Sequence, residues 1–126
     1  ARVRKNDQRR IGRSCFLFLP IRGVFMPVME ISIIPVGTNK TSISGYVAKC
    51  DQILMKEKGI KAQLTAMGTI IESDSIEKLF RLAEKMHRTA LNHSVKRVIT
   101  NITLDERLDK DTSIEKRIES VKKKLF

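Results

Sequence analysis

The chain has 126 residues, of which 41% are hydrophobic and 31% are charged. This composition is typical of one globular domain with a single core, and it excludes an intrinsically disordered chain. The net charge of +11 suggests a nucleic-acid partner, but seven basic residues and one acid lie in residues 1–25. More than half of the excess charge is therefore in one short segment, which favours a solvated basic tail.

The segment before the first regular element is basic and then apolar. "ARVRKNDQRRIGRS" precedes "CFLFLPIRGVF", an order found in signal sequences, but Pro20, Arg22 and Gly23 interrupt the apolar stretch. The stretch is also too short for a transmembrane helix. We predict that residues 1–27 are a basic extension outside the fold and that residues 28–126 form the domain. The two cysteines show no metal or redox spacing, which favours a reduced, cytoplasmic setting.

A strand and a helix are predicted at the start of this domain. "VMEISIIPVG", from Val28, is rich in β-branched residues and stops at Gly37. Apolar residues then recur at helical spacing over residues 43–54, and Thr41 or Ser42 offers an N-cap.

Two strands separated by Gly68 are predicted next. "IKAQLTAM" (residues 60–67) alternates between apolar and polar positions, as in a strand with one buried face. Gly68 allows a tight turn or a bulge, and "TIIES" (residues 69–73) is the expected partner strand.

The second half of the domain predicts a helix, a strand and a last helix. Asp74 and Glu77 have the spacing of a capping box at the start of the first helix. "VKRVITNITLDER" alternates as a strand, and Thr112 with Glu115 marks the start of the last helix. The apolar stripe of that helix consists of Ile114, Ile118, Val121 and Leu125.

The order β-α-β-β-α-β-α predicts an α+β fold, a ferredoxin-like βαββαβ sandwich with an additional C-terminal helix. Two helices cover one face of such an antiparallel sheet and leave the other open. The open face is predicted to carry Ser32, Ile34, Val36, Gln63, Thr65, Met67, Ile99, Asn101 and Thr103. A mixed surface of this kind usually marks an interface, so we expect sheets to pack together between subunits.

Catalysis has little support in the sequence. His87 and His93 are six residues apart on one predicted helix, so they are expected to be exposed and not to share a face as metal ligands. Cys50 lies on an apolar stripe, which favours a core residue. "DERLDKD" lacks the glycine and final glutamate of an EF-hand loop and is interpreted as a solvated turn. We expect no enzyme, no catalytic residue, no metal and no cofactor.

Nucleic-acid binding is the alternative function. RNA-recognition domains share this topology, but they stack bases on aromatic residues of the two central strands. The corresponding stretches here, "VMEISIIPV" and "TIIES", contain no aromatic residue. A nucleic-acid-binding module would therefore have to use the basic N-terminal tail.

Several stretches resemble one family. They are "EISIIPVGT", "TSISGYVAKC", "LTAMGTIIES", "VKRVITNITLDERLDKD" and "SIEKRIESVKK", which together resemble the small thiamine-binding protein family related to the YkoF-type proteins. The most telling parts are the P-x-G-T, M-G-T-x-x-E and D-x-R-x-D-K segments. The resemblance implies a ferredoxin-like fold and cytoplasmic homo-oligomers, in which dimers pair into tetramers through their sheets. It also implies binding of thiamine or its hydroxymethylpyrimidine moiety, and no established catalysis.

Such a ligand combines an aminopyrimidine with a cationic thiazolium. Glu72 could pair with the cation or accept a hydrogen bond from the amino group. Neutral hydrogen bonds would come from Thr65, Thr69, Asn101 and Thr103, and the rings would pack on Ile34 and Met67. The alternative is that these are ordinary interface residues, or that Glu72 or Asp105 is a general base. The face to which Glu72 points stays open, because a bulge at Gly68 would reverse the alternation.

Overall fold

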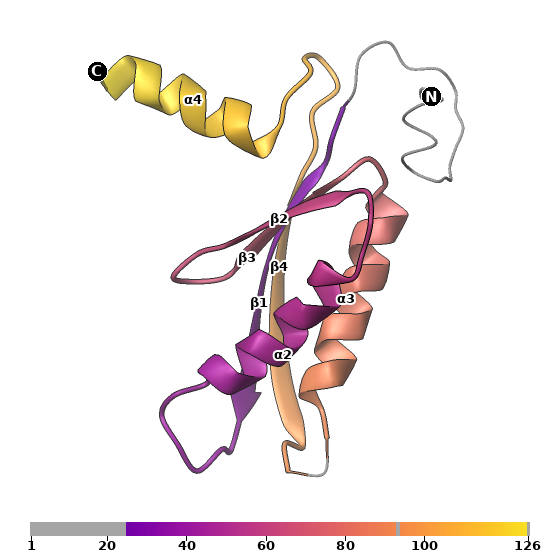
Figure 1. Ribbon diagram of the computed structural model, residues 1–126, viewed down its shortest axis with the longest axis vertical. Helices are drawn as coiled ribbons and strands as arrows, with labels where there is room; N and C mark the ends of the chain where they lie inside the picture. The colour runs from indigo at the N-terminus through magenta and orange to yellow at the C-terminus, as the bar shows by residue number, and fades with distance from the viewer. Residues whose placement is uncertain (1–24, 93, 126) are drawn as a thin grey trace.

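The computed structural model describes residues 25–92 and 94–125, and it confirms the predicted α+β, ferredoxin-like fold. Four antiparallel strands form one sheet in the order β2-β3-β1-β4, with β1 at Val28–Val36, β2 at Ile60–Leu64, β3 at Thr69–Ser73 and β4 at Arg97–Asp105. The helices α2 (Ser44–Met55) and α3 (Ile76–Ala90) lie side by side on one face of the sheet, whereas α4 (Ile114–Leu125) extends away from the end of β4 (Figure 1). The central strands are β1 and β3, as predicted, and neither carries an aromatic residue.

The core lies between the sheet and the helices α2 and α3. Burial alternates along β1, because successive side chains of a strand point to opposite faces of the sheet. Cys50 belongs to this core and is 2% exposed, as the sequence predicts. The buried cluster consists of Met29, Ile31, Ile33, Cys50, Leu54, Ile71, Leu79, Leu82, Ala83, Met86 and Ala90.

The strand register defines which side chains share the open face. Residues directly opposite each other in an antiparallel pair lie on the same side of the sheet. Along β1 and β4 the open-face pairs are Glu30 with Thr103, Ser32 with Asn101, Ile34 with Ile99 and Val36 with Arg97. Along β3 and β2 they are Glu72 with Lys61 and Ile70 with Gln63. We use "open face" for this set of residues below.

The β2–β3 connection differs from the sequence prediction. Strand β2 ends at Leu64, and residues 65–68 form a turn, so Thr65 and Met67 do not lie on the open face of a strand. The Thr65 hydroxyl donates to the carbonyl of Gly68 at 2.8 Å and accepts from the Gly68 amide at 3.1 Å. The Thr65 amide also donates to the Gly68 carbonyl at 2.8 Å, so backbone and hydroxyl together close the turn.

The helix starts also differ by one residue from the prediction. Ser75, not Asp74, caps α3, because its hydroxyl accepts the Lys78 amide at 3.2 Å. Ser113, not Thr112, takes the same role at α4 by accepting the Lys116 amide at 3.2 Å. At α2 the N-cap position is Ile43, which makes no side-chain cap.

Residues that precede Val28, the predicted start of the domain, also pack against it. Pro27 is among the fully buried side chains, and its carbonyl accepts the Ser73 amide at 3.3 Å. Phe25 forms an isolated parallel bridge with Thr112. Residues 1–24 of the predicted extension, residues 1–27, lie outside the described residues.

Gly68 gives a direct test of the β2–β3 geometry. A Cβ atom at this position would lie 3.0 Å from the Ile31 carbonyl oxygen and 3.7 Å from Oε2 of Glu30. Because backbone must then move, Gly68→Ala is expected to lower the free energy of unfolding by about 1–3 kcal/mol in urea denaturation. Gly45→Ala is the matched control, since nothing lies within 4 Å of that Cβ position inside α2. It should stabilise the protein by roughly 0.5–1 kcal/mol, and equal effects of both changes would contradict the crowding at Gly68.

Candidate functional site

A cavity of about 360 Å³ lies where the end of the sheet meets the start of α4. Its wall includes the carboxylates of Glu72, Asp74 and Asp111 and the ammonium groups of Lys61 and Lys116. Lys116 forms an ion pair of 3.7 Å with Asp111, so part of this charge is already neutralised within the wall. The surplus of acids favours a neutral or cationic occupant over an anion.

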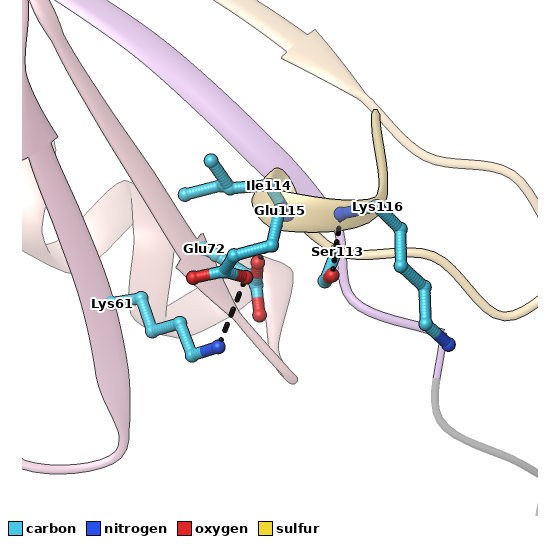
Figure 2. A network of polar contacts seen from close by, with 6 residues as sticks. All are labelled: Lys61, Glu72, Ser113, Ile114, Glu115 and Lys116. Carbon is cyan, nitrogen blue, oxygen red and sulfur yellow. Dashed lines mark hydrogen bonds and ion pairs between the residues drawn. The ribbon is translucent and has the colours of Figure 1, made fainter. Parts of the chain in front are cut away.

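Glu72 is the central residue of this cavity wall. It is 2% exposed, and its Oε1 accepts the backbone amide of Ile114 at 2.8 Å. Ile114 is the first residue of α4, whose N-terminal amides have no partner within the helix and carry partial positive charge. Figure 2 shows Glu72 beneath the turn that leads into α4. The strand β3 therefore supplies the carboxylate that holds the start of the C-terminal helix.

An ion pair between β2 and α4 reinforces this junction. Lys61, beside Glu72 on β2, contacts Oε1 of Glu115 at 3.1 Å (Figure 2). The hydrogen bond to Glu115 raises the pKa of Lys61, and the charges of Glu115 and then Glu72 add to this effect. Backbone hydrogen bonding and then Lys61 lower the pKa of Glu115. Because Lys61 is already paired, it is poorly suited to act as a free anion-binding cation.

Arg117 connects the second turn of α4 to the end of β4. Its Nη1 donates to Asp105, the last residue of that strand. Nε and Nη2 of the same guanidinium are shielded from solvent and have no hydrogen-bond partner in the part of the chain that the structure describes. Asp105 is thus engaged by an arginine, which does not suit a general base.

The middle of the open face has a different chemistry. Ile34 and Ile99 are each 41% exposed, although both are large and apolar. Asn101 and Thr103 follow along β4 and present an amide and a hydroxyl to the same surface. Three predicted site residues, Ile34, Asn101 and Thr103, are therefore brought together on one face.

Thr69, which the sequence analysis named as a possible ligand contact, lies on the other side of the sheet. Its register partner is Ile31, on the helix-covered side, and its hydroxyl donates to the Asp51 carboxylate at 3.1 and 3.2 Å. Burial raises the pKa of Asp51, and the hydrogen bond from Thr69 partly opposes that rise. Thr69 therefore anchors α2 to β3 and lies away from the open face.

The remaining polar candidates have structural partners. His87 is half-buried, not exposed as predicted, and its Nδ1 lies 2.6 Å from Oγ1 of Thr100; His93 lies outside the described residues. Arg107 forms a two-pronged bond to Asp109, with both contacts at 2.7 Å, and this bond lowers the pKa of Asp109 to about 2. Within residues 25–92 and 94–125, no group of three or more His, Cys, Asp or Glu side chains is arranged to hold a metal ion.

Comparison with known proteins identifies the family of this chain. A family model described as thiamine-binding protein matches residues 29–122. The chain belongs to the thiamine-binding protein family. The UPF0045 protein YqgV of Bacillus subtilis is 42% identical over 103 residues, covering 79% of this chain and 98% of the relative. A UPF0045 protein of Methanothermobacter thermautotrophicus is 33% identical over 100 residues, covering 79% of this chain and all of the relative.

Solved structures share the fold of this thiamine-binding family member. MJ1052 of Methanocaldococcus jannaschii superposes with a TM-score of 0.70 at 34% identity, over 77% of this chain and 96% of that chain. TM0486 of Thermotoga maritima has a TM-score of 0.64 over 76% of this chain and 98% of its own. Its identity of 14% shows a common fold alone.

The M-G-T-x-x-E segment now has a physical explanation in this family member. Gly68 allows the close approach to β1, Thr69 bonds to α2, and Glu72 holds the start of α4. The segment therefore joins three parts of the fold. Sequence reasoning missed Glu30, Lys61 and Ile70, although the alternation along each strand places all three on the open face. None of the described helices combines the length and apolar character that crossing a membrane requires.

Proposed function

We propose that this protein binds thiamine or its hydroxymethylpyrimidine moiety without catalysing a reaction, as a cytoplasmic homo-oligomer whose sheets pack over the ligand. The observation that carries the proposal is the open face, where exposed apolar side chains adjoin neutral hydrogen-bonding groups. Membership of the thiamine-binding protein family supports it. So does the name of TM0486, which provisionally assigns that protein to thiamine biosynthesis or salvage.

The side chains of the open face suit an aminopyrimidine. The ring needs donors and acceptors at its edge, which the Asn101 amide and the hydroxyls of Ser32 and Thr103 supply. Its flat faces need apolar contacts, for which Ile34 and Ile70 are available on neighbouring strands. One sheet covers only one side of the ring, so a second sheet is needed to exclude water from the other. The other predicted site residues contribute less directly. Thr65 and Met67 lie in the turn between β2 and β3, Thr69 bonds to α2, and Glu72 holds the start of α4.

Self-association has independent support in α4. The exposed fraction of its apolar stripe rises from 6% at Ile114 to 42% at Ile118, 57% at Val121 and 68% at Leu125. The helix extends away from the sheet (Figure 1), and most of its apolar stripe is not covered by the described residues. Together with Ile34, Val36 and Ile99 on the sheet, this gives one chain two apolar surfaces that a second copy would cover.

Titration calorimetry with thiamine and with hydroxymethylpyrimidine tests the proposed function. We expect saturable binding of at least one of the two by the wild-type protein. Thr103→Val should weaken it roughly 5- to 10-fold, because one hydrogen bond to the ligand is lost and a buried partner group stays unpaired. Thr41→Val removes the same hydroxyl from an exposed loop and is expected to have no effect. Absence of heat and of any thermal shift with both compounds would refute the proposal.

A further inference from the structure

Three carboxylates lie on this side of the sheet, Glu30 and Glu72 on the open face and Asp105 opposite Val28 at the end of β4, and two of them have partners. Glu72 accepts the amide of Ile114, and Asp105 accepts from Arg117. The Glu30 carboxylate makes no hydrogen bond or ion pair with any residue of the described chain. It lies on the central strand β1, so it stands in the middle of the sheet, away from the edges where surface charges are usually solvated.

The neighbours of Glu30 form one row across the sheet. Thr103 on β4 and Ile70 on β3 are its direct partners, and Gln63 on β2 follows Ile70. These three side chains are neutral, so the row provides no cation for Glu30. The glutamate side chain leans toward Gly68, where its Cγ lies 3.6 Å from the Cβ position that the glycine leaves empty. The absence of a side chain at Gly68 therefore gives the carboxylate room on the surface.

The nearby cations are engaged elsewhere or distant. Lys61 is paired with Glu115, and Arg117 with Asp105. Arg97 is opposite Val36, six residues along β1 from Glu30, which is roughly 20 Å at 3.3 Å per residue. If a second sheet covers this face, Glu30 becomes a buried carboxylate without a partner, an arrangement that is strongly unfavourable unless a cation accompanies it.

We propose that Glu30 is the side chain that recognises the positive charge of the ligand, so that the site selects thiamine, with its permanent thiazolium charge, over the neutral hydroxymethylpyrimidine. This inference rests on the proposed function and assigns the specificity of the same site. The pyrimidine is held by Thr103, in the same row as Glu30, and by Asn101, in the next row along β4, and the thiazolium lies over the carboxylate. A neutral ligand leaves Glu30 unpaired between the sheets and binds more weakly.

Calorimetry on Glu30→Gln provides the test, because glutamine keeps the size and polarity of glutamate without its charge. We expect thiamine affinity to fall roughly 10- to 100-fold, the range of a charge-assisted contact in a covered site. The affinity for hydroxymethylpyrimidine should be unchanged or higher. Wild-type affinity for thiamine should also fall with added salt, and that dependence should be weaker in Glu30→Gln. Glu84→Gln, on the exposed surface of α3, is the matched control and should alter neither affinity.

The outcomes separate this inference from the function on which it rests. If wild-type protein binds neither compound, the proposed function fails. If it binds thiamine and Glu30→Gln retains full affinity, or loses affinity equally for both compounds, the assignment of Glu30 is wrong and ligand binding stands. A thermal melt close to that of wild type confirms that the variant is folded, as expected for an exposed side chain.

Discussion

Glu72→Ala is expected to release the start of α4 from the sheet and to lower the free energy of unfolding by roughly 2–3 kcal/mol. The variant removes a buried acceptor, so the Ile114 amide loses its partner and a void remains beside β3. It also removes the negative charge at the positive end of the helix. Urea denaturation measures the free energy, and hydrogen exchange of the α4 amides measures the local release, which should exceed that elsewhere in the domain.

Two further variants separate hydrogen bonding from charge. Glu72→Gln keeps an oxygen that accepts the Ile114 amide, but it loses the attraction to Lys61 and to the helix N-terminus, so its destabilisation should be about half that of Glu72→Ala. Glu115→Gln removes an acid from the same helix turn at an exposed position and should change stability little, because its pair with Lys61 is solvated. If Glu72→Ala leaves both exchange and stability at wild-type values, the carboxylate does not hold α4. In that case its reassignment from ligand group to helix anchor fails.

The faces of the strands were predictable, because the period of two fixes them once one position is assigned. The sequence placed Ser32, Ile34, Asn101 and Thr103 correctly, and the register confirms these positions. The same alternation places Glu30 on the open face. Alternation does not reveal, however, that the Glu30 carboxylate has no partner among the described residues. That property depends on how Lys61 and Arg117 are engaged by other chain segments.

The role of Glu72 was not predictable for a related reason. Its partner, the amide of Ile114, is 42 residues away in sequence and belongs to a helix end. A capping signature in the sequence refers to neighbours within about three residues, so it identifies Ser113 or Thr112 as candidates and cannot identify a carboxylate on a strand. For Thr65 the prediction failed because of a local bond, not a distant one. Its alternation suits a strand, but its hydroxyl bonds to the local backbone at Gly68 and ends β2 early.

A single charge on the exposed stripe of α4 should disrupt self-association. In Val121→Asp a carboxylate would be buried at the contact with a second copy, where an unpaired charge is unfavourable by several kcal/mol. We expect the dissociation constant of the oligomer to rise at least roughly 100-fold, which corresponds to about 2.7 kcal/mol. Sedimentation over a range of protein concentrations should show monomers for the variant where the wild type is associated. Because Val121 is 57% exposed in one copy, the domain itself should stay folded.

Ser120→Asp is the matched control for this experiment. It adds the same charge to the same turn of α4, at an exposed position beside the stripe and about 100° around the helix. Net charge and helix propensity then change alike in both variants. A difference in association therefore shows that the apolar stripe of α4 takes part in the contact. Loss of association in both would indicate a general charge effect. A wild-type protein that stays monomeric at every concentration would refute self-association, and with it the covered environment in which Glu30 needs a cationic ligand.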